Sequence, residues 1–254
     1  MSSSDPRNTV LLGEERRPAF YALAGGGWRD YVTLLHPPYT LWHLSYVAIG
    51  FGLVPDPEPG RLLWTLLAFA LAMGVGAHAL DELNERPLQT AIPSRVLVTL
   101  AAVSIAAATA IGIGAALAWT AWLLPLVAFG AFVVVAYNLE LFGGRFHGDT
   151  WFALSWGAFP TLTAYVAAAE RLTAEAVLAA TFAALLSLAQ RRLSTEVRNV
   201  RRRVARVEGA LEYADGRREP LSTALLLRGP EGALRALTAA VVALGAALVV
   251  LRLV

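Results

Sequence analysis

The stretch "RLLWTLLAFALAMGVGAHALDELNER", residues 61–86, decides the fold class of this chain. From Leu62 to Ala77 almost every residue is apolar, and the run ends abruptly in a charged cluster. A helix needs roughly 20 apolar residues to cross the hydrocarbon core of a bilayer. The stretch therefore predicts a membrane-spanning helix that carries titratable groups at one end.

The composition of the whole chain extends this prediction. Of the 254 residues, 57% are hydrophobic and only 16% are charged, and there is no cysteine. In lipid, a helix satisfies its own backbone hydrogen-bonding groups, so long apolar runs indicate helices. We predict an all-α, polytopic transmembrane bundle with about seven spans, at residues 39–55, 61–81, 96–117, 120–141, 150–169, 173–194 and 233–254.

Two domains follow from the same pattern. Residues 1–27 lack the order of a cleaved signal peptide and are predicted to be a soluble tail. Residues 28–254 form the transmembrane domain, which opens with "WRDYVTLLHPP", either an interfacial segment or an ordinary loop. The segment between the last two spans, residues 208–237, is predicted to be a helical excursion, a glycine turn and a re-entry.

The distribution of arginine orients the bundle. Arginines concentrate in the N-terminal tail, in the loops after the second and fourth spans, and above all in residues 191–228 between the sixth and seventh. Positively charged loops stay in the cytoplasm. We expect a multi-pass protein of the cell membrane, with a cytoplasmic N-terminus and, for seven spans, an extracytoplasmic C-terminus.

The charged cluster at the end of the second span has metal-ligand character. His78, Asp81 and Glu82 stand at i, i+3 and i+4, which places them on one face of a helix. Titratable groups at membrane depth point to function. The alternative is a set of solvated charges at a helix end. The hypothesis that these side chains bind a divalent cation is the more specific of the two.

A second polar stretch follows the sixth span. Glu196, Asn199 and Arg203 repeat at helical spacing inside a dense field of arginines. Guanidinium groups suit phosphate because they donate two parallel hydrogen bonds. The alternative is attraction of these arginines to anionic lipid head groups. We expect Asp81 and Glu196 to face one cavity that holds a phosphorylated lipid. No nucleotide-binding loop is recognisable, and we expect no nucleic-acid partner.

Together these elements resemble the UbiA superfamily of intramembrane prenyltransferases, over roughly residues 30–254. "DELNERPLQTAIPSR", residues 81–95, resembles the end of the family's first acidic motif and the Arg-Pro signature that follows it. "RFHGDTWFALSWGAFPTLTAYVA", residues 145–167, resembles its fifth helix. "TEVRNVRRR", residues 195–203, and "STALLLRG", residues 222–229, resemble the second motif and what comes after it.

The resemblance implies a site in which magnesium holds an isoprenyl diphosphate whose tail lies in the bundle. The implied catalytic residues are Asp81, Glu82 and Glu196. The implied metal ligands are His78, Asp81, Glu82 and Glu196. The implied substrate-binding residues are Arg86, Asn138, Arg145, Arg198, Asn199 and Arg203.

The chain departs from the family pattern in ways that weaken the metal site. Met73 and Ala77 stand where the first motif usually has acids, and Arg203 replaces the last acid of the second. Hard cations prefer several carboxylates. We therefore expect one weakly bound magnesium ion at most, with Arg203 compensating phosphate charge. The family usually has more spans than this chain. A second subunit is one source of the part of the wall around the lipid tail that the additional spans would form.

Two functions remain open from the sequence. The first is an enzyme that ionises an isoprenyl diphosphate and transfers the prenyl group to an unknown acceptor. The second is a non-catalytic UbiA-like protein that binds lipid or assists assembly. In the enzyme, aromatic side chains would face the allylic cation; the alternative for each is simple packing. The candidates are Tyr39, Trp42, Tyr46, Tyr137 and Trp156.

Overall fold

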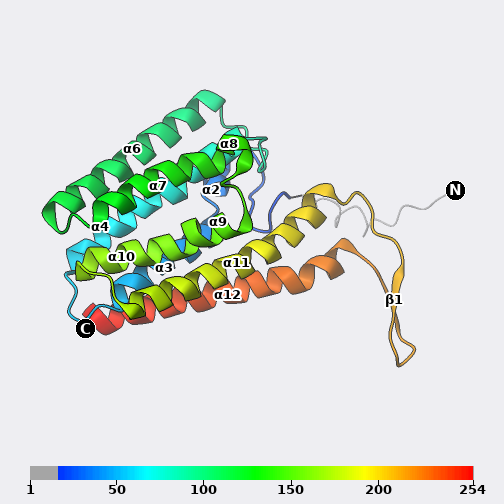
Figure 1. Ribbon diagram of the computed structural model, residues 1–254. Coiled ribbons are helices and arrows are strands. Elements are labelled where there is room, and N and C mark those ends of the chain that lie inside the picture. Colours follow the sequence, from blue (N-terminus) through cyan, green and yellow to red (C-terminus); the bar gives the residue numbers. More distant parts are fainter. Residues whose placement is uncertain (1–16, 254) are drawn as a thin grey trace.

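The computed structural model describes residues 17–253, which form a bundle of long helices (Figure 1). This range is mostly helical, as the all-α prediction requires, and contains one short two-stranded hairpin. The first 16 residues of the predicted tail lie outside the described residues. The helices before the midpoint are α2 (Trp28–Leu34), α3 (Pro37–Gly52), α4 (Pro59–Phe69), η1 (Ala70–Ala77), α5 (His78–Leu83) and α6 (Ser94–Ala118). The remaining elements are α7 (Leu123–Asn138), α8 (Leu141–Gly144), α9 (Asp149–Ala153), η2 (Leu154–Ala158), α10 (Phe159–Ala169), α11 (Ala174–Arg203), β1 (Ala210–Glu212), β2 (Arg218–Pro220) and α12 (Thr223–Leu253).

Each of the seven ranges predicted to span is mostly helical, although α3 and α7 are shorter than the ranges 39–55 and 120–141. Within residues 17–253, five helical stretches are long and apolar enough to cross a membrane: Pro59–Leu83, Ser94–Ala118, Asp149–Ala169, Ala174–Arg203 and Thr223–Leu253. Helices α3 and α7 have 16 residues each and fall short of that length. The chain is thus a polytopic helical protein by length and composition.

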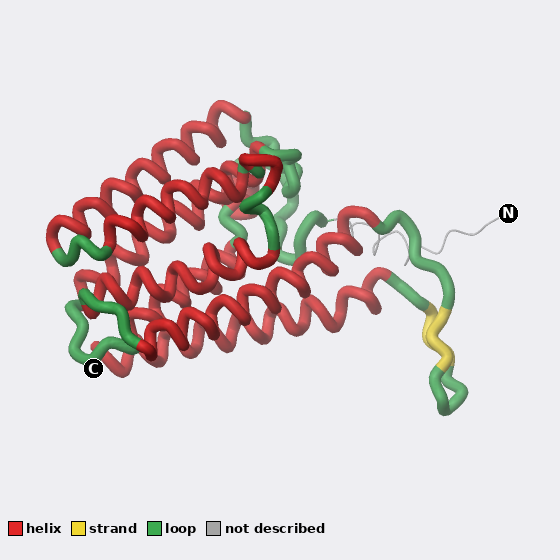
Figure 2. Tube along the Cα trace, in the orientation of Figure 1, coloured by secondary structure: helices red, strands yellow, loops and turns green. Residues whose placement is uncertain are grey.

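The last long helix differs from the prediction at its start. Helix α11 continues to Arg203, as the helical spacing of Glu196, Asn199 and Arg203 predicts, but α12 begins at Thr223 instead of near residue 233. Between them lies a two-stranded antiparallel hairpin, not a helical excursion, and it projects beyond the bundle (Figure 2). The extensions pair with each other, since Arg201 Nε donates to Glu231 Oε1 at 2.6 Å. Leu227, Leu234 and Val197 pack together beside this ion pair.

The packing places several polar connections at one end of the bundle. Helix α3 packs against α10 and α12, α11 packs against α12 and η2, and α6 packs against η1. The start of the described chain, α8 and the hairpin lie at one end, and the C-terminus lies at the other (Figure 1). The three loops predicted to share a face are therefore gathered at the end where the described chain begins.

Two of the long helices contain a π-helical segment, η1 and η2. In a π-helix the hydrogen bond skips an additional residue, and such segments are common at functional sites. Segment η2 packs tightly on α11. A Cβ added at Gly157 would meet Ser187 Oγ at 2.7 Å and the carbonyl of Ala183 more closely still. Glycine is thus required for this close approach.

Replacing Gly157 with alanine is expected to destabilise the bundle by about 1–3 kcal/mol, because the added methyl group must push η2 away from α11. The thermal unfolding temperature in detergent measures this loss. Gly114→Ala is the matched control, since a Cβ at Gly114 meets nothing within 4 Å. An unchanged unfolding temperature for Gly157→Ala would show that the η2–α11 contact is looser than described.

Candidate functional site

The loop after α5 is built around the carboxylate of Glu82. This side chain is fully buried, and its two oxygens accept hydrogen bonds from the backbone N–H of Leu88 and from Thr90. The Thr90 hydroxyl adds a third bond, at 2.9 Å. The carboxylate of Glu82 is consequently committed to the loop, and in this structure it does not line the cavity where a cation would bind.

Arg86 has a similar structural task. Its guanidinium donates to the carbonyls of Thr90 and Ile92 and to the hydroxyl of Ser94. These bonds close residues 86–94 into a compact turn. Arg86 was predicted to bind substrate, but all its described hydrogen bonds are made to residues of its own loop. The turn holds α5, and with it Asp81, in place.

A polar cavity of about 220 Å³ opens beside this loop. Its walls come from the segment before α2, the start of α3, η1 and α5, the end of α7, the loop before α9, and α11. Its titratable lining residues are Tyr21, His36, Tyr39, His43, His78, Asp81, Tyr137, His147, Arg191, Arg198 and Arg202. The cavity thus brings together residues that are far apart in the sequence.

The charged groups of the polar cavity are one aspartate and three arginines. Among the described residues, no hydrogen bond or ion pair engages the carboxylate of Asp81. Arg191 is held by Asp149 at 2.6 Å and also donates to the hydroxyl of Tyr137. Arg198 donates to Ser194 and Thr195 one turn earlier on the same helix. Positive charge therefore exceeds negative charge in the lining, which favours an anionic ligand.

A neutral pair, Tyr21 and His36, closes one side of the cavity. The Tyr21 hydroxyl and His36 Nδ1 are 2.7 Å apart. Burial raises the pKa of Tyr21 well above its usual value. Burial, together with the charges of His78 and the nearby arginines, lowers the pKa of His36 well below its usual value. Both groups are uncharged near neutral pH.

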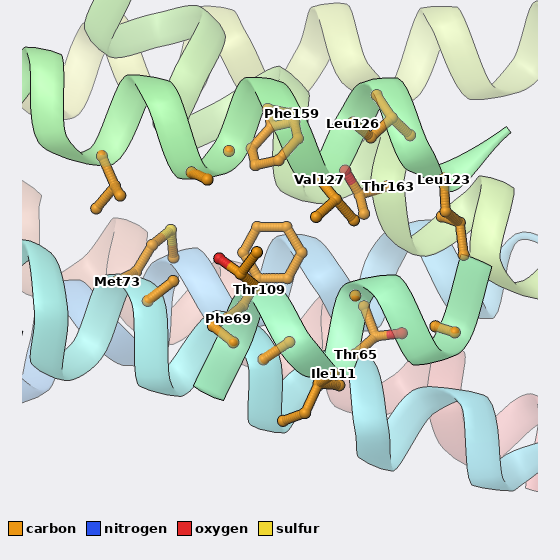
Figure 3. A pocket seen from close by; sticks show the side chains of 18 of the residues that line it. Thr65, Phe69, Met73, Thr109, Ile111, Leu123, Leu126, Val127, Phe159 and Thr163 are labelled. Atoms are coloured by element: carbon orange, nitrogen blue, oxygen red, sulfur yellow. The ribbon is translucent and has the colours of Figure 1, made fainter. Parts of the chain in front are cut away.

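A second, apolar cavity of about 100 Å³ lies deeper in the bundle, between α4, α6, α7 and α10 (Figure 3). Phe69 and Phe159 face each other across part of it, with ring centroids 5.4 Å apart. The lining is otherwise mainly aliphatic, with Val127, Leu126 and Leu123 among its residues. Its surface suits a hydrocarbon chain.

Met73 and Trp156 line both cavities, which are therefore neighbours. Met73 lies in η1 and Trp156 in η2, so each π-helical segment supplies one of the shared lining residues. Four buried side-chain atoms in the described range lack a hydrogen-bond partner, and all four belong to lining residues. They are His36 Nε2 and Gln190 Oε1 in the polar cavity, and Ser155 Oγ and Thr163 Oγ1 in the apolar one. A buried polar atom without a partner destabilises the fold. Such atoms are typical of a site that is completed by a ligand.

The structure brings four of the predicted site residues to the polar cavity: His78, Asp81, Asn138 and Arg198. Asn138 is buried and donates to the carbonyl of Val134, 2.7 Å away. The predicted residues outside the cavity lining are Glu82, Arg86, Arg145, Glu196, Asn199 and Arg203. Asp81 and Glu196 therefore do not face one cavity, contrary to the prediction.

The misplaced residues on α11 have a simple geometric explanation. Residues on a helix are rotated by about 100° from one to the next. The face that lines the cavity carries Arg191, Ser194, Arg198 and Arg202. The sequence motif placed the site on Glu196, Asn199 and Arg203 instead, and Glu196 and Arg203 are exposed. The motif residues and the cavity-lining residues thus lie on the same helix but on different faces.

Several lining residues were not predicted as site residues. They are His36, His43, Gln190, Arg191 and Arg202. The two histidines could have been found from the recurrence of polar groups near the start of the first span. Of the predicted aromatic residues, Tyr39, Tyr137 and Trp156 line the polar cavity, whereas Trp42 and Tyr46 are buried partners in a hydrogen bond of 2.6 Å.

No group of three or more His, Asp or Glu side chains that could hold a metal ion is found in residues 17–253. Comparison with known proteins adds no assignment. No family model matches the chain, and neither a curated protein nor a solved structure matches it.

Proposed function

We propose that this chain binds a lipid with a diphosphate head group and acts as a divergent UbiA-type prenyltransferase. The observation that carries the proposal is the pair of neighbouring cavities, one polar with excess positive charge and one apolar, which share Met73 and Trp156 in their linings. A lipid with an anionic head and a hydrocarbon tail fits this pair. Isoprenyl diphosphate is favoured over other phosphorylated lipids by the sequence resemblance.

The head group is assigned to the space between α5 and α11. Arg198 and Arg202 supply fixed positive charge from α11, and Asp81 faces the same cavity from α5. Guanidinium groups bind phosphate oxygens through charge-assisted hydrogen bonds. The tail would pass between Met73 and Trp156 into the apolar cavity. The allylic carbon next to the head would then lie near this junction.

Magnesium has a restricted role in this proposal. Asp81 is the unpaired carboxylate of the cavity, and one ion bound there would need diphosphate oxygens and water to complete its preferred oxygen coordination. Such an ion would stabilise negative charge on the leaving diphosphate. The arginines of α11 supply the same stabilisation without an ion. A single magnesium ion, held jointly with substrate, fits these residues.

The reaction would begin with cleavage of the bond between the allylic carbon and the diphosphate. Arg198 and Arg202 would stabilise the departing oxygens. The aromatic faces of Tyr137 and Trp156 line the polar cavity and would stabilise the positive charge left on the carbon. In this proposal α3 and α7 also cross the membrane, which gives seven spans. The polar cavity then faces the cytoplasm.

Binding of geranylgeranyl diphosphate to the detergent-purified protein is expected to rise with magnesium along a single-site curve. EDTA should weaken binding by about tenfold, because one charge-assisted contact contributes about 1.5 kcal/mol. Asp81→Asn should abolish the magnesium effect. Asp56→Asn, at an exposed loop residue, is the matched control. A steep curve that requires two ions would contradict this account of the metal.

Catalysis itself is tested by release of inorganic diphosphate. The protein, geranylgeranyl diphosphate and a membrane lipid extract as the source of acceptor are incubated with magnesium. Release above that of Arg198→Ala supports the enzyme. Tight binding of geranylgeranyl diphosphate without release favours the alternative, a non-catalytic lipid-binding protein. The scarcity of carboxylates in the cavity is the observation that supports this alternative.

A further inference from the structure

All four histidines of the chain line the polar cavity. They come from four separate places: the residue before α3, α3 itself, α5 and the loop before α9. His36 and His78 stack with ring centroids 4.1 Å apart. Arginine alone would suffice to bind a diphosphate. The histidines therefore indicate that the cavity recognises something more.

Three of the histidines are oriented in the same way. Nδ1 lies 2.7 Å from the carbonyl of Trp156 in His43, 3.1 Å from that of Gly74 in His78, and 2.9 Å from that of Tyr137 in His147. A carbonyl oxygen only accepts hydrogen bonds, so Nδ1 carries the proton in each ring. In a neutral imidazole, Nε2 is then a hydrogen-bond acceptor. No described residue bonds the Nε2 of these three rings.

Gln190 adds a fourth acceptor. Its side chain is 2% exposed, it lines the polar cavity, and its Oε1 has no hydrogen-bond partner. We call His43, His78, His147 and Gln190 the histidine wall. The arginines that line the cavity are donors and come from α11, which also carries Gln190. The cavity therefore offers both hydrogen-bond acceptors and cationic donors.

The ligand of the histidine wall must bring hydrogen-bond donors. A metal ion is disfavoured, because no three His, Asp or Glu side chains in residues 17–253 converge on one point. An ammonium group is disfavoured by the excess of arginine over aspartate in the lining. Neutral hydroxyl groups remain, since they donate to imidazole nitrogen and amide oxygen without adding charge.

We propose that the histidine wall binds a polyhydroxylated molecule, a polyol or sugar, next to the diphosphate site. This inference rests on the proposed function, in which the polyol is the prenyl acceptor. In the transfer, a hydroxyl oxygen forms a bond to the allylic carbon as the bond from that carbon to the diphosphate breaks. The bonding electrons leave with the diphosphate. The hydroxyl proton moves to an Nε2 of the wall.

The test compares two phosphates of similar shape, myo-inositol 1-phosphate and cyclohexyl phosphate, by calorimetric titration of the detergent-purified protein. Both offer a phosphate to the arginines, and only the first offers hydroxyl groups. Inositol phosphate is expected to bind at least about tenfold more tightly, as two or more added hydrogen bonds predict. Geranylgeranyl diphosphate is titrated in parallel.

Two substitutions at one position sharpen the result. His78→Asn places an amide N–H where Nδ1 stands and removes the acceptor at Nε2, so the preference for inositol phosphate should be lost. His78→Gln extends an amide oxygen toward the place of Nε2 and should retain most of it. If inositol phosphate binds no more tightly than cyclohexyl phosphate, the inference is overturned. Geranylgeranyl diphosphate then decides separately whether the proposed function stands.

Discussion

Replacing Glu82 with alanine is expected to lower the thermal unfolding temperature by about 10 °C. The substitution leaves the donors of Leu88 and Thr90 buried without a partner. Each unsatisfied buried donor costs about 1–3 kcal/mol, and the combined loss should reach about 3–5 kcal/mol. For a chain of this size, 1 kcal/mol corresponds to about 2–4 °C. Unfolding in detergent, followed by tryptophan fluorescence, measures the change.

Two variants distinguish this structural role from a role in metal binding. Glu85→Ala, three residues along the same loop, should have little effect because Glu85 is exposed. Glu82→Gln should be intermediate, since the amide keeps one acceptor oxygen. If Glu82→Ala unfolded at the temperature of the unaltered protein and lost only magnesium-dependent binding, Glu82 would be a metal ligand as the sequence predicted.

The second large effect is expected on α11. Arg198→Ala and Arg202→Ala should each weaken binding of geranylgeranyl diphosphate about ten- to a hundredfold, because each removes a charge-assisted bond worth about 1.5–3 kcal/mol. The double variant should lose about a thousandfold if the two sites act independently. Calorimetric titration at fixed ionic strength measures these changes.

Arg203→Ala is the matched control for both arginine variants. It removes the same charge from the same helix, one residue beyond Arg202, but Arg203 does not line the cavity. Its affinity should change less than about twofold, as is usual for exposed charges. Equal losses for Arg198, Arg202 and Arg203 would mean that the arginine field acts through its overall charge and not through a defined face.

The parts of the fold that depend on local pattern could be predicted from the sequence. Apolar runs of span length located the long helices, since that signal needs no tertiary information. The start of α12 could not be located in this way. Its first turns lie beyond the apolar run, and the contact that joins them to α11 is an ion pair between Arg201 and Glu231, two residues from different helices. The hairpin at residues 210–220 is short and polar, and its pairing has no periodic signal.

The sequence predicted which helices line the polar cavity better than it predicted which residues on those helices do so. Asp81 and Arg198 were identified because they sit in motif-like stretches. Glu82 and Arg86 hold their own loop in the structure, and a carboxylate that holds a loop looks the same in sequence as one that holds a cation. The π-helical segments had no recognisable sequence signal, although Met73 and Trp156 within them line both cavities. His36 and His43 reach the site through the packing of α3 against distant elements.

The central claim is that one lipid diphosphate occupies both cavities. A structure of the protein with magnesium and a non-hydrolysable geranylgeranyl thiolodiphosphate tests it most directly. The account predicts the diphosphate between Asp81 and the pair Arg198 and Arg202, with the tail passing Met73 and Trp156 into the apolar cavity. A structure in which Asp81 pairs directly with these arginines, with the lipid bound elsewhere, would contradict it.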